Sequence, residues 1–318
     1  MNGVVVVDKP AGRTSHRVVQ DVRRTLGVRK AGHTGTLDPL ATGVLPVCLE
    51  EATKLAPFLM EGNKEYRATL LLGTTTDTMD RDGRILSNRE VHVSTGDIEE
   101  VIPRFIGRIC QVPPVYSAIK LHGEPLYRRA RRGEAVSPPP RWVDIYRIDI
   151  EEVRLPHVTL RVACSKGTYI RSLCSDIGEV LGCGACLTEL RRLRNGPFAE
   201  ENAVSYDGMS PEEARKVLLE AMIPMAEALG DDMCTIFVER DEAKKIREGW
   251  QPCVDTFRGV DIPFLAPGDM IKVLNVQGEL VAVAEMLFSS EQLLAEKGDV
   301  QAARLLRVFL PSNIDRNQ

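Results

Sequence analysis

The segment from residue 31 to residue 46 constrains the fold more than any other part of the chain. It reads AGHTGTLDPLATGVLP and holds three glycines and two prolines. Glycine destabilises a helix interior, and proline removes a helical hydrogen bond and clashes with the preceding turn. The segment therefore cannot form a regular helix. We expect a shaped loop, and such loops commonly carry functional groups on a rigid scaffold.

Asp38 lies at the centre of this loop, directly before Pro39. A residue before proline is held in an extended or turned conformation, which can aim its carboxylate into a cleft. The alternative is a turn aspartate that bonds only to its own backbone. The spacing of the loop leaves both readings open.

Apolar periodicity predicts helices and strands on both sides of the loop. The clearest helix start is Ser210-Pro211-Glu212-Glu213, which combines a Ser cap, a first-turn Pro and a Glu three residues after the cap. That helix is expected to reach about Met222. The other predicted helices run from Thr14 or Ser15 to 27, over 96–105 and over 169–181, and the predicted strands are 4–7, 66–72 and 157–164.

The character of the chain changes after residue 230. A short helix over 242–249 precedes several strand patterns, and Gln277-Gly278 is the expected turn between two of them. For a chain of 318 residues we predict two domains, residues 1–230 and a small β-rich unit at 231–318. The strands of that unit are predicted at 270–275, 280–287 and 305–310.

Composition narrows the class of protein. The chain has 41 Lys and Arg against 45 Asp and Glu, so its net charge of −4 gives no sign of nucleic acid. The apolar run at 4–7 is too short for a signal peptide or a membrane span. Eight cysteines without an export signal indicate reduced thiols in the cytoplasm, and most of them lie in apolar surroundings typical of buried small hydrophobes.

Cys183 and Cys186 form a lone C-x-x-C pair. A structural zinc site needs four ligands, usually two such pairs or one pair with nearby histidines. The chain has no second C-x-x-C, and the flanking Gly182 and Gly184 fit a helix end better. We expect no metal here.

Basic residues gather in residues 127–133, YRRARRG. A basic run beside aromatic residues suits phosphates and base stacking, although a charge run is also usual on a solvated face. In a chain with no basic excess this clustering favours RNA binding. The arginines are Arg128, Arg129, Arg131 and Arg132, with Arg141-Trp142, Arg191-Arg192 and Arg194 adding to them.

The chain resembles TruB-type tRNA pseudouridine synthases, in order from about residue 3 to residue 198. Residues 32–43, GHTGTLDPLATG, are similar to the catalytic motif of that family. The tail resembles a PUA domain, a small RNA-binding β-barrel. Other family motifs are resembled by DKPAG at 8–12, KEYR at 64–67 with LGTTTDTMDRDG at 72–83, PPVYSAIK at 113–120, CSKGTYIR at 164–171 and LRRL at 190–193.

The resemblance implies an α+β pseudouridine synthase fold. Its sheet is mixed and largely antiparallel, with flanking helices, an active-site cleft across it, and a small C-terminal PUA-like barrel. Residues 121–150 resemble the inserted RNA-gripping segment of the stand-alone bacterial enzymes, which favours an enzyme that needs no guide RNA.

The resemblance also assigns the site. Asp38 would be the catalytic carboxylate, held by two parallel bonds from Arg171, and Tyr66 would stack on the extruded base. The alternatives are a surface arginine, a core tyrosine and a backbone-bonded His33. The substrate contacts implied are His33 in the vacated stack, Asp80, Tyr169 and Leu190 in the pocket, Lys9, Lys54 and Lys64 at phosphates, and the arginines Arg128, Arg129, Arg131 and Arg132.

The implied reaction converts uridine 55 in the T arm of tRNA to pseudouridine, without a cofactor or metal. The carboxylate attacks C1′, attacks the base or removes a sugar proton; the residues do not choose. The expected partner is tRNA, with no membrane and no guide RNA, and the protein is expected to be a cytoplasmic monomer. The rival functions are an RNA chaperone without turnover and a synthase acting on other RNAs.

Overall fold

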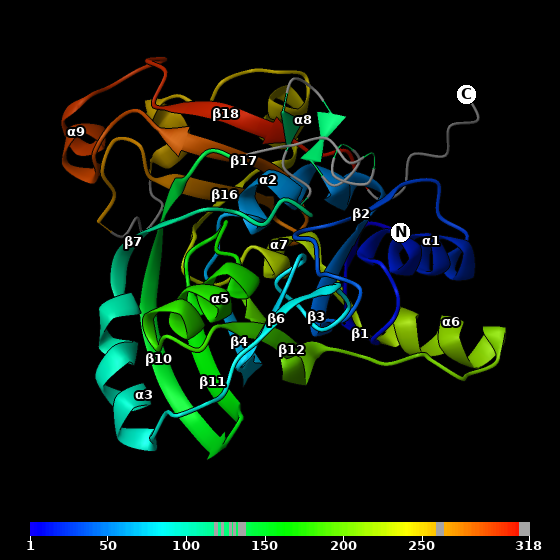
Figure 1. Cartoon of the computed structure of the whole chain (residues 1–318). Coiled ribbons are helices and arrows are strands. Elements are labelled where there is room, and N and C mark those ends of the chain that lie inside the picture. The colour runs from blue at the N-terminus through cyan, green and yellow to red at the C-terminus, as the bar shows by residue number, and fades with distance from the viewer. Residues whose placement is uncertain are drawn as a thin grey trace.

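A large sheet and a smaller C-terminal sheet form the framework of the molecule, with helices packed around them (Figure 1). The computed structural model describes residues 1–117, 120–121, 124–126, 129, 132, 138–258 and 264–311. The combination of helices with a mixed sheet confirms the predicted α+β class.

The large sheet is largely antiparallel, as predicted. Its one parallel pairing within the described chain joins the third and fourth strands of the order given below. In that order the strands are β14 (Met222–Pro224), β1 (Gly3–Lys9), β3 (Thr42–Leu49), β12 (Ala185–Asn195), β4 (Lys64–Leu72), β11 (His157–Cys164), β10 (Arg141–Arg154) and β7 (Gly107–Gln111), while β2 (Ala31–His33) pairs with β3 and β13 (Phe198–Ala199) with β12.

Two helices pack on the core of this sheet. The helix α1 (Ser15–Leu26) begins after Thr14, whose hydroxyl accepts a hydrogen bond from the Arg17 backbone N–H, and ends at Gly27, where φ is 67°. Helix α5 (Ile170–Val180) buries its apolar face against β12 and β4. Both helices confirm the predicted apolar periodicity.

The segment 31–46 is a loop only over its middle. Strands β2 and β3 take its two ends, so the expectation of a loop throughout was wrong. The reason is visible at Gly43, which has a φ of 95° and whose added Cβ would lie 2.3 Å from the Arg192 carbonyl oxygen. Glycine here lets β3 approach β12 closely, and this approach brings the loop of Asp38 beside β12.

The remaining helices of the first part differ from prediction at their ends. Helix α6 (Pro211–Glu220) stops before Met222 because that residue begins β14 and pairs with β1. Helix α3 (Thr95–Val101) passes into a 3₁₀ turn at Ile102–Phe105. The other short elements are α2 (Ala56–Leu59), α7 (Met225–Ala228), the hairpin of β5 (Thr74–Thr76) and β6 (Ile85–Asn88), the pair β8 (Lys120–Leu121) and β9 (Glu124–Pro125), and the 3₁₀ turns Glu50–Leu55 and Glu200–Asn202.

The C-terminal sheet confirms the strands predicted in the tail. Its order is β15 (Cys234–Val238), β16 (Met270–Asn275), β17 (Leu280–Met286) and β18 (Ala303–Val308). Strand β15 was not predicted, although Gly230-Asp231-Asp232 provide a turn signal just before it. Closure of this sheet into a barrel stays a prediction. Helices α8 (Arg240–Arg247) and α9 (Ser290–Ala295) and the 3₁₀ turn Val254–Phe257 accompany the sheet.

The two sheets share an apolar core. One face of β1 contributes Val4 and Val6 to it, and the tail contributes Val283 and Phe309, all fully buried. The ammonium of Lys272 on β16 donates hydrogen bonds to the carbonyls of residues 226 and 230, at 3.4 and 2.8 Å. The small unit therefore packs firmly on the large sheet, and the boundary at residue 230 stays a prediction.

The predicted insertion at 121–150 overlaps the large sheet. Residues 141–150 belong to β10, which pairs with both β7 and β11. Val143 and Ile145, two residues apart on one face of β10, are both buried, as expected of a strand that has a neighbour on each side. The C-terminal third of the predicted insertion is therefore part of the scaffold.

The cysteines behave mostly as small hydrophobes. Six are buried, among them Cys48 and Cys164, whose pKa values burial raises to about 12 and about 11. Gly182 and Gly184 follow α5 with φ values of 81° and 74°, as a helix end requires. In the described part of the chain, no helix has both the length and the apolar character needed to cross a membrane.

Candidate active site

A cleft of about 750 Å³ opens beside the loop that carries Asp38. Its walls come from that loop, from β4, β10 and β12, and from the segment that leads into α5. The cleft thus gathers residues that lie far apart in the sequence. Of the predicted site residues it is lined by Asp38, Lys64, Tyr66, Tyr169, Arg171 and Leu190.

Buried contacts hold the loop in its shape. The Ser15 hydroxyl lies 2.8 Å from the Leu37 backbone N–H and 3.0 Å from the Leu37 carbonyl oxygen. The Asp38 side chain remains one-third exposed. Among the described residues its carboxylate bonds to Arg171 and forms no hydrogen bond to its own loop, so the turn-aspartate reading is not supported.

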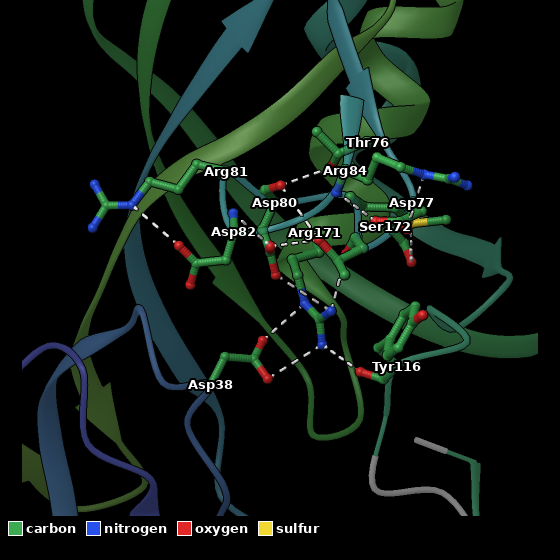
Figure 2. Close-up of polar contacts among 12 residues, drawn as sticks. Asp38, Thr76, Asp77, Asp80, Arg81, Asp82, Arg84, Tyr116, Arg171 and Ser172 are labelled. Carbon is green, nitrogen blue, oxygen red and sulfur yellow. Dashed lines mark hydrogen bonds and ion pairs between the residues drawn. The ribbon is translucent and has the colours of Figure 1, made fainter. Parts of the chain in front are cut away.

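Arg171, at the second position of α5, meets Asp38 directly (Figure 2). Its Nη2 donates to Oδ1 at 3.2 Å, and its Nε lies 2.8 Å from Oδ2. The Nε contact has ion-pair distance without hydrogen-bond geometry. The expected pairing of two oxygens with one guanidinium is present, with one well-aligned bond instead of two.

The same guanidinium is anchored from behind. Nη1 donates to the Thr78 carbonyl at 3.0 Å, and Nη2 donates to the Tyr116 carbonyl at 2.9 Å. Only 5% of the Arg171 side chain is exposed, so the surface-arginine reading is wrong. Two backbone carbonyls thus fix the guanidinium, which directs its Nε and Nη2 at the Asp38 carboxylate in the cleft.

Asp80 lies behind the arginine and does not line the cleft. Its Oδ2 is 3.5 Å from Arg171 Nη1, and its Oδ1 accepts hydrogen bonds from the Thr78 hydroxyl and the Asp82 backbone N–H. Burial raises the pKa of Asp80, while these bonds and Arg171 oppose that rise. Asp80 therefore orients Arg171 and has no direct access to a ligand in the cleft.

Tyr66 forms part of the cleft floor, and Arg192 lies directly across from it in the register of β4 and β12. Arg192 is 1% exposed, donates to the carbonyls of Val44 and Gly35 at 2.7 and 3.1 Å, and has no carboxylate partner among the described residues. The guanidinium lies close enough to the Tyr66 phenol to influence the pKa of both groups, although burial dominates and raises that of Tyr66.

The sequence reading missed Arg192, which it grouped with surface arginines. Strand alternation offered a signal, because residues 190 and 192 share a face and Leu190 was predicted in the pocket. Arg191 points the other way and pairs with Asp8 and Glu200, at 3.0 and 3.1 Å. Arg192 is therefore buried and not available to phosphates, whereas an RNA contact of the partly exposed, ion-paired Arg191 stays a prediction.

The predicted phosphate role of Lys9 is also wrong. Lys9 is fully buried, and its Nζ donates to the carbonyls of Pro10, Pro39 and Ala41 at 2.9, 3.2 and 2.6 Å. The residue ties the loop of Asp38 to β1, and desolvation lowers its pKa to about 8.

The other two lysines are also engaged by the protein. Lys64 is buried, bonds to the carbonyls of Met60 and Gly62, and has its pKa lowered to about 8 by burial. Lys54 lies outside the cleft, 2.6 Å from Glu51 and 3.1 Å from the Val308 carbonyl. Lys64 reaches the cleft wall, whereas Lys54 links the first part of the chain to β18.

The stability contributed by Lys9 should rise with pH. Its folded-state pKa of about 8 lies below the ordinary value of 10.5, so between these values the unfolded chain binds more protons. We expect the difference in unfolding free energy between wild type and Lys9→Met to grow in favour of wild type by about 1–3 kcal/mol from pH 7 to pH 10. Urea unfolding at both pH values measures this difference. The matched control is Lys216→Met, at an exposed lysine. A Lys9→Met difference that stays constant or falls with pH would contradict the buried, pKa-lowered state of Lys9.

His33, Tyr169 and Leu190 surround the cleft in different ways. His33 does not line it; its Nδ1 accepts the Gly35 backbone N–H at 3.3 Å, as the backbone-bonded alternative expected. Burial lowers its pKa, which keeps the ring neutral at pH 7. Tyr169 is the N-cap residue of α5; its backbone N–H donates to Gln111 Oε1 and its carbonyl accepts from Gln111 Nε2, while Leu190 forms an apolar wall.

The predicted arginine cluster is only partly described. Arg132 makes a two-pronged pair with Glu124, with contacts of 2.6 and 2.8 Å, and Arg129 is half-buried. Arg128 and Arg131 lie outside the described residues. As for metals, the described part of the chain contains no group of three or more His, Cys, Asp or Glu side chains arranged to hold an ion.

Comparisons with known proteins agree with this arrangement. The family described as "TruB family pseudouridylate synthase (N terminal domain)" matches residues 23–170, and the "tRNA pseudouridylate synthase B C-terminal domain" matches residues 171–230. A Syntrophus aciditrophicus protein named tRNA pseudouridine synthase B is 53% identical over 97% of this chain and 99% of its own length. A Geobacter sulfurreducens protein of the same name is 42% identical over 97% and 100%.

A solved structure shares the fold. It is described as an H/ACA RNP bound to a substrate RNA containing 2′-deoxyuridine. The match has a TM-score of 0.72 and 30% identity, and it covers 97% of this chain and 85% of the other. The similarity thus spans both sheets and the cleft between the loop of Asp38 and α5.

Proposed function

The chain belongs to the TruB family of pseudouridylate synthases, and from this membership we propose that it converts uridine 55 in the T arm of tRNA to pseudouridine. The reaction breaks the N1–C1′ bond, turns the base and joins C5 to C1′, so the enzyme is an isomerase. Atoms are conserved within one nucleotide, and the central requirement is a charged group beside the sugar.

The observation that carries the proposal is the Asp38–Arg171 pair in the cleft. The carboxylate is partly exposed to the cleft, whereas the guanidinium behind it is almost fully buried. A guanidinium at hydrogen-bond distance fixes the direction of the carboxylate. Attack on C1′, attack on the base and removal of a sugar proton all use an ionised carboxylate in that position.

The surrounding residues suit a flipped-out uridine. Tyr66 offers an aromatic face on the cleft floor, and Leu190 and Tyr169 offer apolar surface beside it. We assign the stacking of the target base to Tyr66. His33, on the loop next to the cleft and neutral at pH 7, would fill the space that the base leaves in the RNA, which offsets part of the unstacking cost.

The finer assignments follow the same proposal. Residues 231–318 would form a PUA-like RNA-binding unit, supported by the four-stranded sheet at 234–308. The arginines of residues 128–132 would grip RNA phosphates. We propose a cytoplasmic monomer that acts on tRNA without a guide RNA.

Release of tritium tests the proposal. A T-arm hairpin transcribed with uridine labelled at C5 should lose the label from the target position, because the new bond forms at that carbon. We expect stoichiometric release from the T-arm hairpin and none from hairpins of unrelated sequence, with the modified position mapped by chemical sequencing. Binding without release would instead indicate a chaperone, and equal release from unrelated hairpins would indicate a synthase of broader substrate range.

A further inference from the structure

Trp142 is a large aromatic side chain left 63% exposed at the edge of the cleft. It lies at the second position of β10, and single exposed apolar residues are ordinary on protein surfaces. Its setting is what distinguishes it. The other tryptophan of the chain, Trp250, is partly buried against the core of the C-terminal sheet.

An arginine holds the Trp142 ring in place. The Arg108 guanidinium lies 5.5 Å from the ring centroid, within the range of a cation–π contact. Arg108 comes from β7, where Cys110 stands directly opposite Trp142, so the arginine is its diagonal neighbour on the open face of the sheet. The indole therefore has one face occupied by a cation and presents the rest of its surface outward.

A second pair of the same kind lies inside the cleft. Arg141, the residue before Trp142, points to the opposite face of β10 and lies 5.6 Å from the centroid of Tyr169. Neither Arg108 nor Arg141 forms an ion pair within the part of the chain that the structure describes. Two aromatic rings, Trp142 at the rim and Tyr169 inside the cleft, therefore each lie beside an arginine that no carboxylate neutralises among the described residues.

This combination fits unpaired nucleotides. Every base has a π-face that stacks on an aromatic side chain, and an arginine without a carboxylate attracts the adjoining phosphate. Trp142 lines the edge of the same cleft as Tyr169, so the rim ring is within reach of a nucleotide adjacent to the one in the cleft. A protein partner has no phosphate backbone, so it would not need a positive charge beside each ring. The arrangement therefore favours RNA over protein.

We propose that Trp142, held by Arg108, stacks on an unpaired base that neighbours the target uridine in the substrate RNA. The inference rests on the proposed function for the identity of the RNA. It makes the cleft a site for at least two nucleotides, with Asp38 acting on one and the rim platform holding the next. The platform binds substrate and does not touch the reacting atoms.

Substitution of Trp142 should weaken binding and spare chemistry. We expect Trp142→Ala to raise Kd and KM for a T-arm hairpin by about 5- to 100-fold with single-turnover kcat within about 3-fold of wild type, the range expected for one lost base stack. Trp142→Phe should keep most of the affinity because it keeps a ring. Leu86→Ala is the matched control, since Leu86 is similarly exposed, at 59%, on β6 and does not line the cleft.

Hairpins with one abasic nucleotide locate the stacked base. Removing the base 5′ or 3′ of the target should cost the wild type affinity at one of these positions, and Trp142→Ala should show no further loss there. In a Trp250→Phe variant, Trp142 is the sole indole, and its fluorescence should be quenched by the intact hairpin and not by that abasic one. Additive losses at both positions, or unchanged Kd and KM in Trp142→Ala, would overturn the platform.

The same hairpin separates this inference from the proposed function. A wild type that releases tritium while Trp142→Ala behaves identically overturns the platform alone. A wild type that releases none, yet binds the hairpin with an affinity that depends on Trp142 and one neighbouring base, supports the platform and overturns the proposed activity.

Discussion

Asp38→Asn is expected to abolish tritium release from a T-arm hairpin while leaving the affinity for that RNA within several-fold of wild type. Asparagine has nearly the same shape, so the loop and the cleft keep their form. It has no charge, and its amide cannot attack or accept a proton as a carboxylate does. The expected loss of rate is on the order of 10⁴-fold or more, the size seen when a group that touches the reacting atoms is removed.

Single-turnover release and equilibrium binding on the same hairpin measure the two effects. Asp82→Asn is a suitable control, because that side chain is 61% exposed and lies 3.9 Å from Arg81, outside the cleft. It should keep full activity. Turnover by Asp38→Asn within tenfold of wild type would refute the role of Asp38, whichever of the three reaction paths holds.

Arg171→Lys is expected to lower the single-turnover rate by on the order of 10²–10³-fold, with a much smaller change in RNA affinity. Lysine keeps the positive charge but cannot contact Asp38 and the Thr78 and Tyr116 carbonyls from one planar group. The carboxylate would lose its fixed direction. The rate should recover little at high pH, because the defect is one of geometry and not of protonation.

Arg171→Met should also lower the free energy of unfolding by about 3–5 kcal/mol, because it leaves the buried Asp80 charge without its partner. Urea denaturation measures this loss. Adding Asp80→Asn to Arg171→Met should restore part of the stability and none of the activity. An Arg171→Met protein with wild-type stability and rate would show that the guanidinium neither supports Asp80 nor directs Asp38.

Local patterns in the sequence predicted most of the elements. Apolar alternation predicted β11, the cap at Thr14 and the glycine at 27 predicted α1, and the Ser210 cap predicted α6. These signals act over a few residues, so they predict an element without knowledge of the elements that pack against it. They fail where a distant element decides the outcome: α6 ends early because Met222 pairs with β1, a strand far away in the sequence.

The likeness to known motifs predicted the pairing of Asp38 with Arg171 across 133 positions of sequence, and the structure brings the two together. It could not reveal what each lysine and arginine contacts. Lys9 and Arg192 read as surface cations, yet both are buried and donate hydrogen bonds to backbone carbonyls of the segment that carries Asp38. Every residue has a backbone carbonyl, so the sequence does not show which carbonyls will face a given cation. Only the folded backbone fixes their directions.

The sequence by itself determined the family, the class of fold and the chemical groups present: one carboxylate on a glycine-rich loop, one arginine at a helix start and one tyrosine on a strand. Only the tertiary structure decided which charges face the cleft and which support it from within. The parallel approach of β3 to β12, allowed by Gly43, brings the loop against Arg192, while α5 delivers Arg171 between Asp38 and Asp80. Such contacts depend on the packing of distant strands, which side-chain identity along the chain does not specify.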